Sequence, residues 1–136
     1  MTTEGQMDGI RYGRALLGAV IVEVLLGVVA VPILYLSANP APALNLAIPP
    51  ASFVLAMLVV TWLFARSGRP VANGVATGLM SIMLYVVLGA VAYLVAPEQA
   101  NLSQSLSLPY LAAHVLKVLG GGFGGYLIAR KASPAA

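Results

Sequence analysis

Three ionisable residues lie inside long apolar stretches of this sequence. Glu23 interrupts an apolar run over 15–36, and His114 and Lys117 interrupt another over 109–130. A charged side chain at the centre of a membrane-spanning helix costs about 2.5–3.5 kcal/mol on insertion scales, so such residues are functional candidates by default. His114 and Lys117 are three positions apart and share a helix face. These three residues are the first members of a candidate site.

Two hydroxyl residues of a third apolar run, Ser81 and Tyr85, join the candidate site. Counted at about 1.5 Å per residue from the nearest cytoplasmic arginine, Glu23 lies about 13 Å deep, Ser81 about 18 Å, Lys117 about 20 Å, and Tyr85 and His114 about 24 Å. Side chains lean toward the N-terminus of their own helix, so Glu23 and Lys117 lean in opposite directions. We therefore expect a water or one of the two hydroxyls to bridge them. The alternatives are that Lys117 snorkels to the external surface or contacts another subunit.

The chemistry open to these residues is proton or ion handling rather than metal catalysis. In a functional interpretation Glu23 accepts a proton or a cation; in a structural one, the charged groups form an ion pair that fixes helix packing. His114 is the only histidine, and the chain has no cysteine. Because a metal or haem site needs further ligands at suitable spacing, we predict no metal and no cofactor.

Glycines at four-residue spacing form a second unusual feature. The fourth apolar run contains two overlapping GxxxG pairs, and the third contains one. Small residues allow helices to approach closely in lipid, so we predict that these glycines pack helices together. The alternative is a broken helix whose freed backbone lines a binding cavity. The glycines are Gly74, Gly78, Gly120, Gly121, Gly124 and Gly125.

Composition identifies the elements that must position this site. The chain has 136 residues, of which 60% are hydrophobic and only 8% charged. A soluble domain carries roughly 25% charged residues, so this chain cannot cover itself with a polar surface. A membrane-spanning helix needs about 20 apolar residues, and four such runs are present. We predict an all-α integral membrane protein with spans over about 15–36, 46–65, 71–96 and 109–130.

The segments outside the spans are short. Residues 1–14 form a polar N-terminal segment, residues 15–131 the transmembrane domain, and residues 132–136 a tail. The stretch SANPAPALN over 37–45 is predicted to be a Pro-rich loop, with Pro49 and Pro50 in the first turn of the second span.

Basic residues predict the orientation. Six of them fall before the first span, between the second and third, or after the fourth, and the other two loops have no Lys or Arg. By the positive-inside rule, both termini are cytoplasmic, in an up-down antiparallel bundle in a bacterial inner membrane. The basic residues mark topology and give no indication of a nucleic-acid partner. They are Arg11, Arg14, Arg66, Arg69, Arg130 and Lys131.

One internal similarity suggests a duplication. The sequence WLFARSGRP over 62–70 aligns with YLIARKASP over 126–134. Two duplicated hairpins, related by an axis along the membrane normal, would explain it. The simpler explanation is that any helix leaving toward the cytoplasm favours an aromatic, small residues and an arginine.

The stretch Gly18-Ala-Val-Ile-Val-Glu23-Val resembles the first helix of small multidrug resistance transporters. In that family a membrane glutamate carries the coupling proton, and the resemblance implies that role for Glu23. It covers about seven residues, and the rest departs from the family pattern because the fourth span has a buried lysine and a glycine run. The sequence therefore does not place this chain in that family.

Two functions remain open. The first is a small transporter or channel, oligomeric, with Glu23 and Lys117 lining the pathway, which predicts a water-filled cavity reaching Glu23. The second is a non-catalytic accessory or assembly subunit that docks a larger membrane protein, which predicts a dry Glu23–Lys117 contact. A membrane enzyme ranks last, because no cluster of acid, base or metal ligands lies near an interface.

Overall fold

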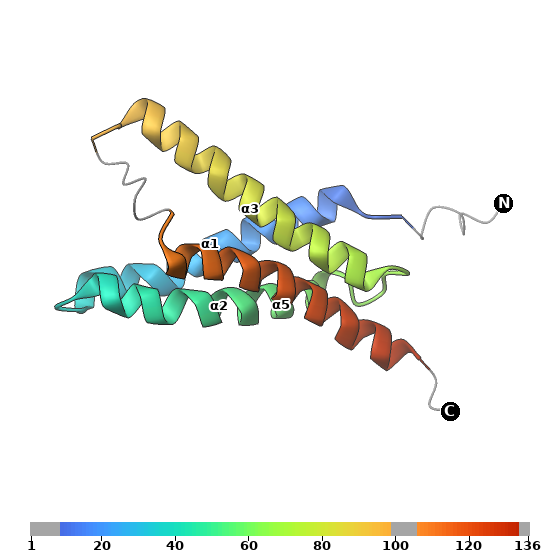
Figure 1. Ribbon diagram of the computed structural model, residues 1–136. Helices are drawn as coiled ribbons and strands as arrows, with labels where there is room; N and C mark the ends of the chain where they lie inside the picture. The colour runs from blue at the N-terminus through green and yellow to red at the C-terminus, as the bar shows by residue number, and fades with distance from the viewer. Residues whose placement is uncertain (1–8, 99–105, 134–136) are drawn as a thin grey trace.

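The computed structural model describes residues 9–98 and 106–133 and contains four long helices in that part of the chain. They are α1 (Tyr12–Leu36), α2 (Pro40–Leu63), α3 (Pro70–Val95) and α5 (Leu108–Ala132). In Figure 1, α1 and α3 run from right to left and α2 and α5 return from left to right. No strand occurs among the described residues.

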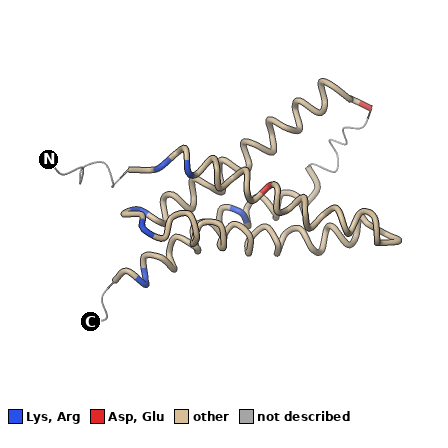
Figure 2. The backbone as a smooth tube through the Cα atoms, turned by 180° about the vertical axis from the view of Figure 1, so that it is seen from behind, with Lys and Arg blue, Asp and Glu red and all other residues tan. Residues whose placement is uncertain are grey.

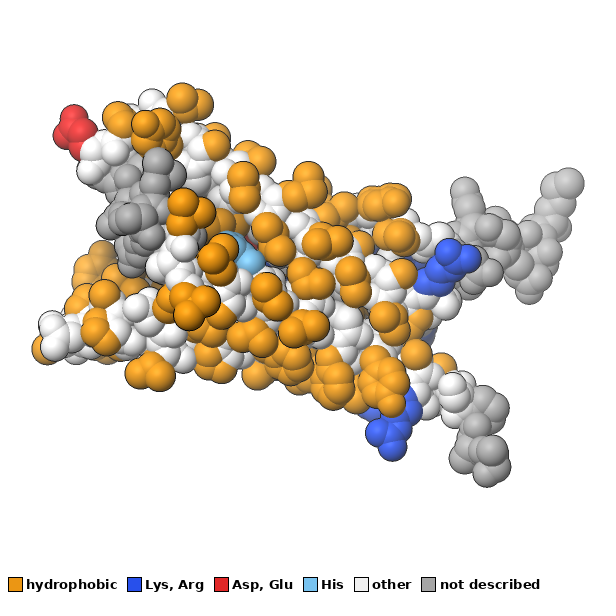
Figure 3. Space-filling model, viewed as in Figure 1, with side chains coloured by type: hydrophobic (Ala, Val, Ile, Leu, Met, Phe, Trp, Pro, Cys, Tyr) orange, Lys and Arg blue, Asp and Glu red, His pale blue; other side chains and the backbone are white. Residues whose placement is uncertain are grey.

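Each helix is long and apolar enough to cross a membrane. The lengths are 25, 24, 26 and 25 residues, and about 20 residues suffice for a span. The prediction of four apolar helices with membrane-spanning character is confirmed. Apolar side chains cover most of the face seen in Figure 3, as expected of helices whose solvent is lipid.

The second helix begins earlier than the sequence indicated. The expected loop over 37–45 is wrong for its last six residues, because α2 already starts at Pro40. The first amides of a helix have no intrahelical acceptor, so a proline there costs little. Pro49 and Pro50 consequently lie inside the helix and not in its first turn. Because proline has no backbone N–H, they cannot donate to the carbonyls of Asn45 and Leu46.

The four helices form a ring in the order α1, α2, α5, α3. Both α1 and α5 pack against α2 and against α3, while the backbones of α1 and α5 do not approach each other within the described residues. The two duplicated hairpins would be α1 with α2 and α3 with α5. If a two-fold axis along the bundle related them, α1 would lie opposite α3 in the ring. In the structure α1 and α3 are neighbours. The repeat would also pair Ala15 and Val22, both buried, with Leu79 and Val86, both at least half exposed. These observations favour the simpler explanation of the internal similarity.

The glycines of α5 bring it close to two neighbours at once. A Cβ added to Gly120 would lie 2.3 Å from the carbonyl oxygen of Phe53 in α2, and one added to Gly121 would lie 2.2 Å from that of Gly74 in α3. Gly124 and Gly125 repeat this pattern one turn later. The two GxxxG pairs therefore form two stripes, one facing each neighbour. The helix is continuous through them, so the alternative of a broken helix is wrong.

The bundle is tight at one end and open at the other. Lys and Arg gather at the end where α1 begins and α5 ends (Figure 2), which we call the basic end. There α3 is buried at 70, 73, 74, 77, 78 and 81. In its second half, every residue over 86–95 is exposed, and α3 diverges from the other helices (Figures 1 and 2). The candidate site lies where this divergence starts.

Candidate functional site

An ion pair between α1 and α5 forms the centre of the site. The Lys117 ammonium donates to Glu23 Oε1 across 2.5 Å, and the Ser81 hydroxyl of α3 donates to the same oxygen. The pair spans the diagonal of the helix ring, where the two backbones do not touch. The expectation that a water or hydroxyl must bridge the two charges is wrong, since the contact is direct and Ser81 supports it from the side.

The two partners differ in exposure. Lys117 is 2% exposed as a residue, whereas the side chain of Glu23 is 18% exposed. Snorkelling of the lysine to the external surface is therefore excluded in this structure. A charge buried this deeply is tolerated only when it is paired, so Glu23 is required to keep Lys117 in the bundle. The carboxylate is the member of the pair that other molecules can reach.

An aromatic wall continues the site toward the open end. The ring of Tyr85 lies 5.6 Å from the Lys117 ammonium, within the range of a cation–π contact. His114 meets the same ring edge-on at 4.6 Å between centroids, and Tyr110 lies 6.3 Å from it. The fold thus brings together all five residues proposed from the sequence and adds Tyr110.

A cavity of about 410 Å³ leads to the ion pair. Glu23, Lys117, His114, Tyr85 and Tyr110 contribute its polar and aromatic lining. The remaining lining is aliphatic or small, and most of it comes from α1 and α2: Leu26, Gly27, Ala30, Leu34, Leu44, Ile48 and Ala113. The ionisable groups are therefore not sealed in a dry core but form one end of a hollow with apolar walls.

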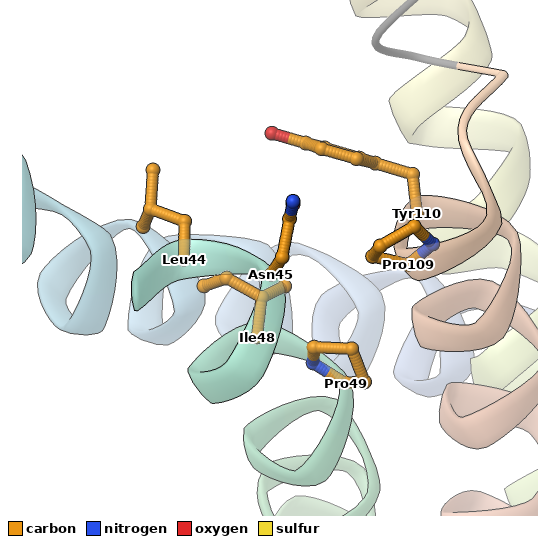
Figure 4. Close-up of a pocket in the computed structure, with 6 residues that line it drawn as sticks. All are labelled: Leu44, Asn45, Ile48, Pro49, Pro109 and Tyr110. Carbon is orange, nitrogen blue, oxygen red and sulfur yellow. The ribbon is translucent and has the colours of Figure 1, made fainter. Parts of the chain in front are cut away.

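A smaller pocket lies beside this cavity, and Tyr110 is among the residues that line both. Figure 4 shows its ring above the gap between α2 and α5, with the hydroxyl directed toward the start of α2. Asn45 points up toward the ring, and Pro49 and Pro109 close the pocket below it (Figure 4). This pocket holds only about 10 Å³, the scale of a single water. Leu44, Ile48 and Tyr110 line both hollows, so the small pocket adjoins the cavity.

Some buried polar atoms near the site have no hydrogen-bond partner among the described residues. One is Nδ1 of His114, and another is the hydroxyl oxygen of Ser52 on α2. Such atoms are rare in folded proteins, where a polar group removed from water normally finds a partner. The imidazole of His114 is therefore not satisfied at Nδ1 within the described part of the chain.

A buried asparagine at the basic end escaped the sequence analysis. Asn73 is 0% exposed; it accepts from the backbone amide of Arg11 at 2.7 Å and donates to Ser67 and to the carbonyl of Arg69. Thr77, also buried, donates to the carbonyl of Asn73. The signal was available, because Asn73 is an uncharged polar residue within an apolar run. A search restricted to ionisable groups could not find it.

The donor set indicates what the site can do. Among the described residues no group of three His, Cys, Asp or Glu side chains could hold a metal ion. A carboxylate paired with a lysine beside a hollow can bind a polar group or exchange a proton. Comparison with protein-family models, with curated proteins and with solved structures finds no match to this chain. The case for function therefore depends on the site alone.

Proposed function

We propose that this chain is a small polytopic protein of a bacterial inner membrane that acts as a transporter or channel. In this proposal the four helices form an up-down bundle with both termini in the cytoplasm, because all Lys and Arg residues other than Lys117 lie at one end (Figure 2). The polar site of Glu23, Lys117 and His114 binds the transported species. The single observation that supports this role is the cavity, which reaches the ion pair from the end opposite the basic residues.

The helices pack tightly at the basic end and diverge at the other, which supports an opening on the non-cytoplasmic side. At the basic end the glycine stripes and Asn73 close the bundle. Beyond Ser81, α3 leaves its neighbours and the cavity begins. A transporter needs a site that one side of the membrane can reach while the other side is closed, and this asymmetry fits that requirement. Proton exchange at Glu23 would then couple binding to a gradient.

Cysteine accessibility tests whether the cavity is a pathway. The chain lacks cysteine, so single cysteines can be placed without further changes. Gly27 lines the cavity and has no atom within 4 Å of an added Cβ, while Val28 next to it is 62% exposed and lies outside the lining. A thiol in water reacts with a charged reagent and a thiol in hydrocarbon does not. In proteoliposomes, Gly27→Cys should react about tenfold faster or more than Val28→Cys.

Proton flux tests the role of the carboxylate. We expect Glu23→Gln to slow the dissipation of an imposed pH gradient, measured with a dye trapped in proteoliposomes. Glu98→Gln is the matched control, because Glu98 is exposed beyond the end of α3. The transport proposal fails if wild-type protein, both variants and empty liposomes give the same rate. Equal thiol reaction at residues 27 and 28 would count against the pathway as well.

A second candidate, a non-catalytic accessory or assembly subunit, has one observation in its favour. Every residue of α3 over 86–95 is exposed, which gives a long apolar helix face that no other described helix covers. A larger membrane protein or a second copy could cover it, as lipid could. Purification in mild detergent separates the two functions: the accessory role requires a co-purifying membrane protein, and a functional protein alone in proteoliposomes excludes it.

A further inference from the structure

The bonding of the Glu23 carboxylate leaves one of its oxygens for a ligand. Both donors that reach this residue, Lys117 and Ser81, bind Oε1. Among the described residues no donor reaches Oε2, and the side chain is 18% exposed at the cavity. A carboxylate oxygen without a donor gains from any hydrogen-bond donor placed there. The site therefore presents an acceptor to the cavity.

The charge balance of the pair selects against ions. Glu23 and Lys117 neutralise each other, so the polar end of the cavity has no net charge to offset a charged ligand. A cation bound at Oε2 would lie close to the Lys117 ammonium, which is bonded to the other oxygen of the same carboxylate. An anion would lie close to the carboxylate itself. Like charges repel at such short distances, so an uncharged donor fits best.

The walls of the cavity indicate the rest of the ligand. One side is aliphatic, with Leu26 and Leu34 from α1 and Ile48 from α2. The other side is the aromatic wall, which includes His114, whose Nδ1 has no hydrogen-bond partner among the described residues. α3 diverges from the other helices along its exposed segment over 86–95 (Figure 1), and Tyr85, just before this segment, lines the cavity. An entrance beside Tyr85 would admit a molecule dissolved in the hydrocarbon.

We propose that the substrate of this site is an uncharged, lipid-soluble compound with a hydroxyl head group. The hydroxyl donates to Glu23 Oε2, and the alkyl part lies along the aliphatic walls of α1 and α2. This inference rests on the proposed transport function and specifies its substrate class. It differs from ion conduction, for which apolar walls along most of the cavity would be unfavourable.

Photolabelling in nanodiscs tests the substrate class. Three probes carry the same diazirine-bearing alkyl chain and differ only in the head group, which is a hydroxyl, a sulfonate or a trimethylammonium. The blocked variant is Gly27→Trp, which adds bulk to the cavity at a position where a Cβ meets no atom within 4 Å. Val28→Trp adds the same bulk on the outer face and is the matched control. Each variant is first checked for wild-type helicity and elution volume.

We expect the hydroxyl probe to label the peptides that contain Leu34 and Leu44, with a loss of about fivefold or more in Gly27→Trp and no loss in Val28→Trp. The charged probes should label the wild type no better than the blocked variant. Stronger cavity labelling by either charged probe overturns the substrate class, as does hydroxyl labelling that Gly27→Trp leaves unchanged. If the Gly27→Cys thiol still reacts from water, the pathway stands and only the substrate class fails; if it does not, both fail.

Discussion

Gly74 offers a sharp test of how α3 and α5 are held together. A Cβ added there would lie 2.0 Å from the carbonyl oxygen of Gly121 and 2.6 Å from its carbon. Ordinary contact begins at 3.4 Å, so Gly74→Ala must move that oxygen by about 1.4 Å. The obstacle is backbone in the middle of a helix, which cannot rotate away as a side chain can. The two helices must separate along the whole contact.

The energetic consequence can be estimated from overpacked cores. Inserting one methylene into a close-packed site costs about 1–3 kcal/mol, and a backbone obstacle places this case at the upper end, near about 3 kcal/mol. Gly89→Ala is the matched control, because Gly89 lies in the same helix with nothing within 4 Å of an added Cβ. There the lower backbone entropy of alanine should be neutral or stabilise by about 0.5–1 kcal/mol. The two variants should therefore differ by about 3–4 kcal/mol.

Reversible unfolding in mixed micelles measures this difference. Purified protein in mild detergent is titrated with sodium dodecyl sulfate while helicity is followed by circular dichroism, and the free energy of unfolding is compared at one detergent composition. If Gly74→Ala and Gly89→Ala fall within about 0.5 kcal/mol of each other, the backbone contact between α3 and α5 does not hold the bundle, and the reasoning is refuted.

Three further predictions follow from the ion pair, the basic end and the orientation. Glu23→Gln should lower the free energy of unfolding by about 3–5 kcal/mol, because it leaves Lys117 buried and unpaired; adding Lys117→Met should restore most of the loss, and no recovery would contradict the pairing argument. Asn73→Ala removes three side-chain hydrogen bonds and should cost about 2–3 kcal/mol in the same titration, so a change below about 0.5 kcal/mol would dismiss its structural role. In spheroplasts, an impermeant maleimide should label Ala38→Cys and leave Gly68→Cys unlabelled until the membrane is opened; the reverse pattern would invert the proposed topology.

The helices were predictable because the physical requirement is simple. Lipid cannot hydrogen-bond a bare backbone, and uninterrupted apolar runs of about 20 residues satisfy theirs as helices. The start of α2 was not predictable by the same logic, since Pro40 and Pro42 act as loop signals in general and as acceptable first-turn residues in a helix. Whether these prolines form a loop or a first helical turn depends on whether α1 and α2 pack against each other as far as the residues that connect them.

The membership of the site was predictable, but its geometry was not. Depths counted from arginines assume that these residues lie in one plane. In the structure Gly125 packs against Pro70, the first residue of α3, so Arg130 lies five residues past that level. At about 1.5 Å per residue, the count placed Lys117 about 7 Å too deep. With this correction, its depth matches that of Glu23, which explains why the two charges meet directly.

The position of the ion pair follows from where close packing ends. The last glycine contact of α3 is Gly78, whose added Cβ would meet the backbone of Val118, next to Lys117 in α5. One turn further, Ser81 donates to Glu23, and beyond it α3 leaves the bundle. The small residues allow α3 and α5 to pack with their backbones in contact. The larger side chains beyond them force the two helices apart. The ion pair lies where α3 begins to diverge from the other helices. At that point a buried charge can be held by three helices and still face a cavity. A substitution that alters the packing of α3 where the divergence begins should therefore affect both the stability of the bundle and access to Glu23. A substitution further along α3 should affect access to Glu23 alone.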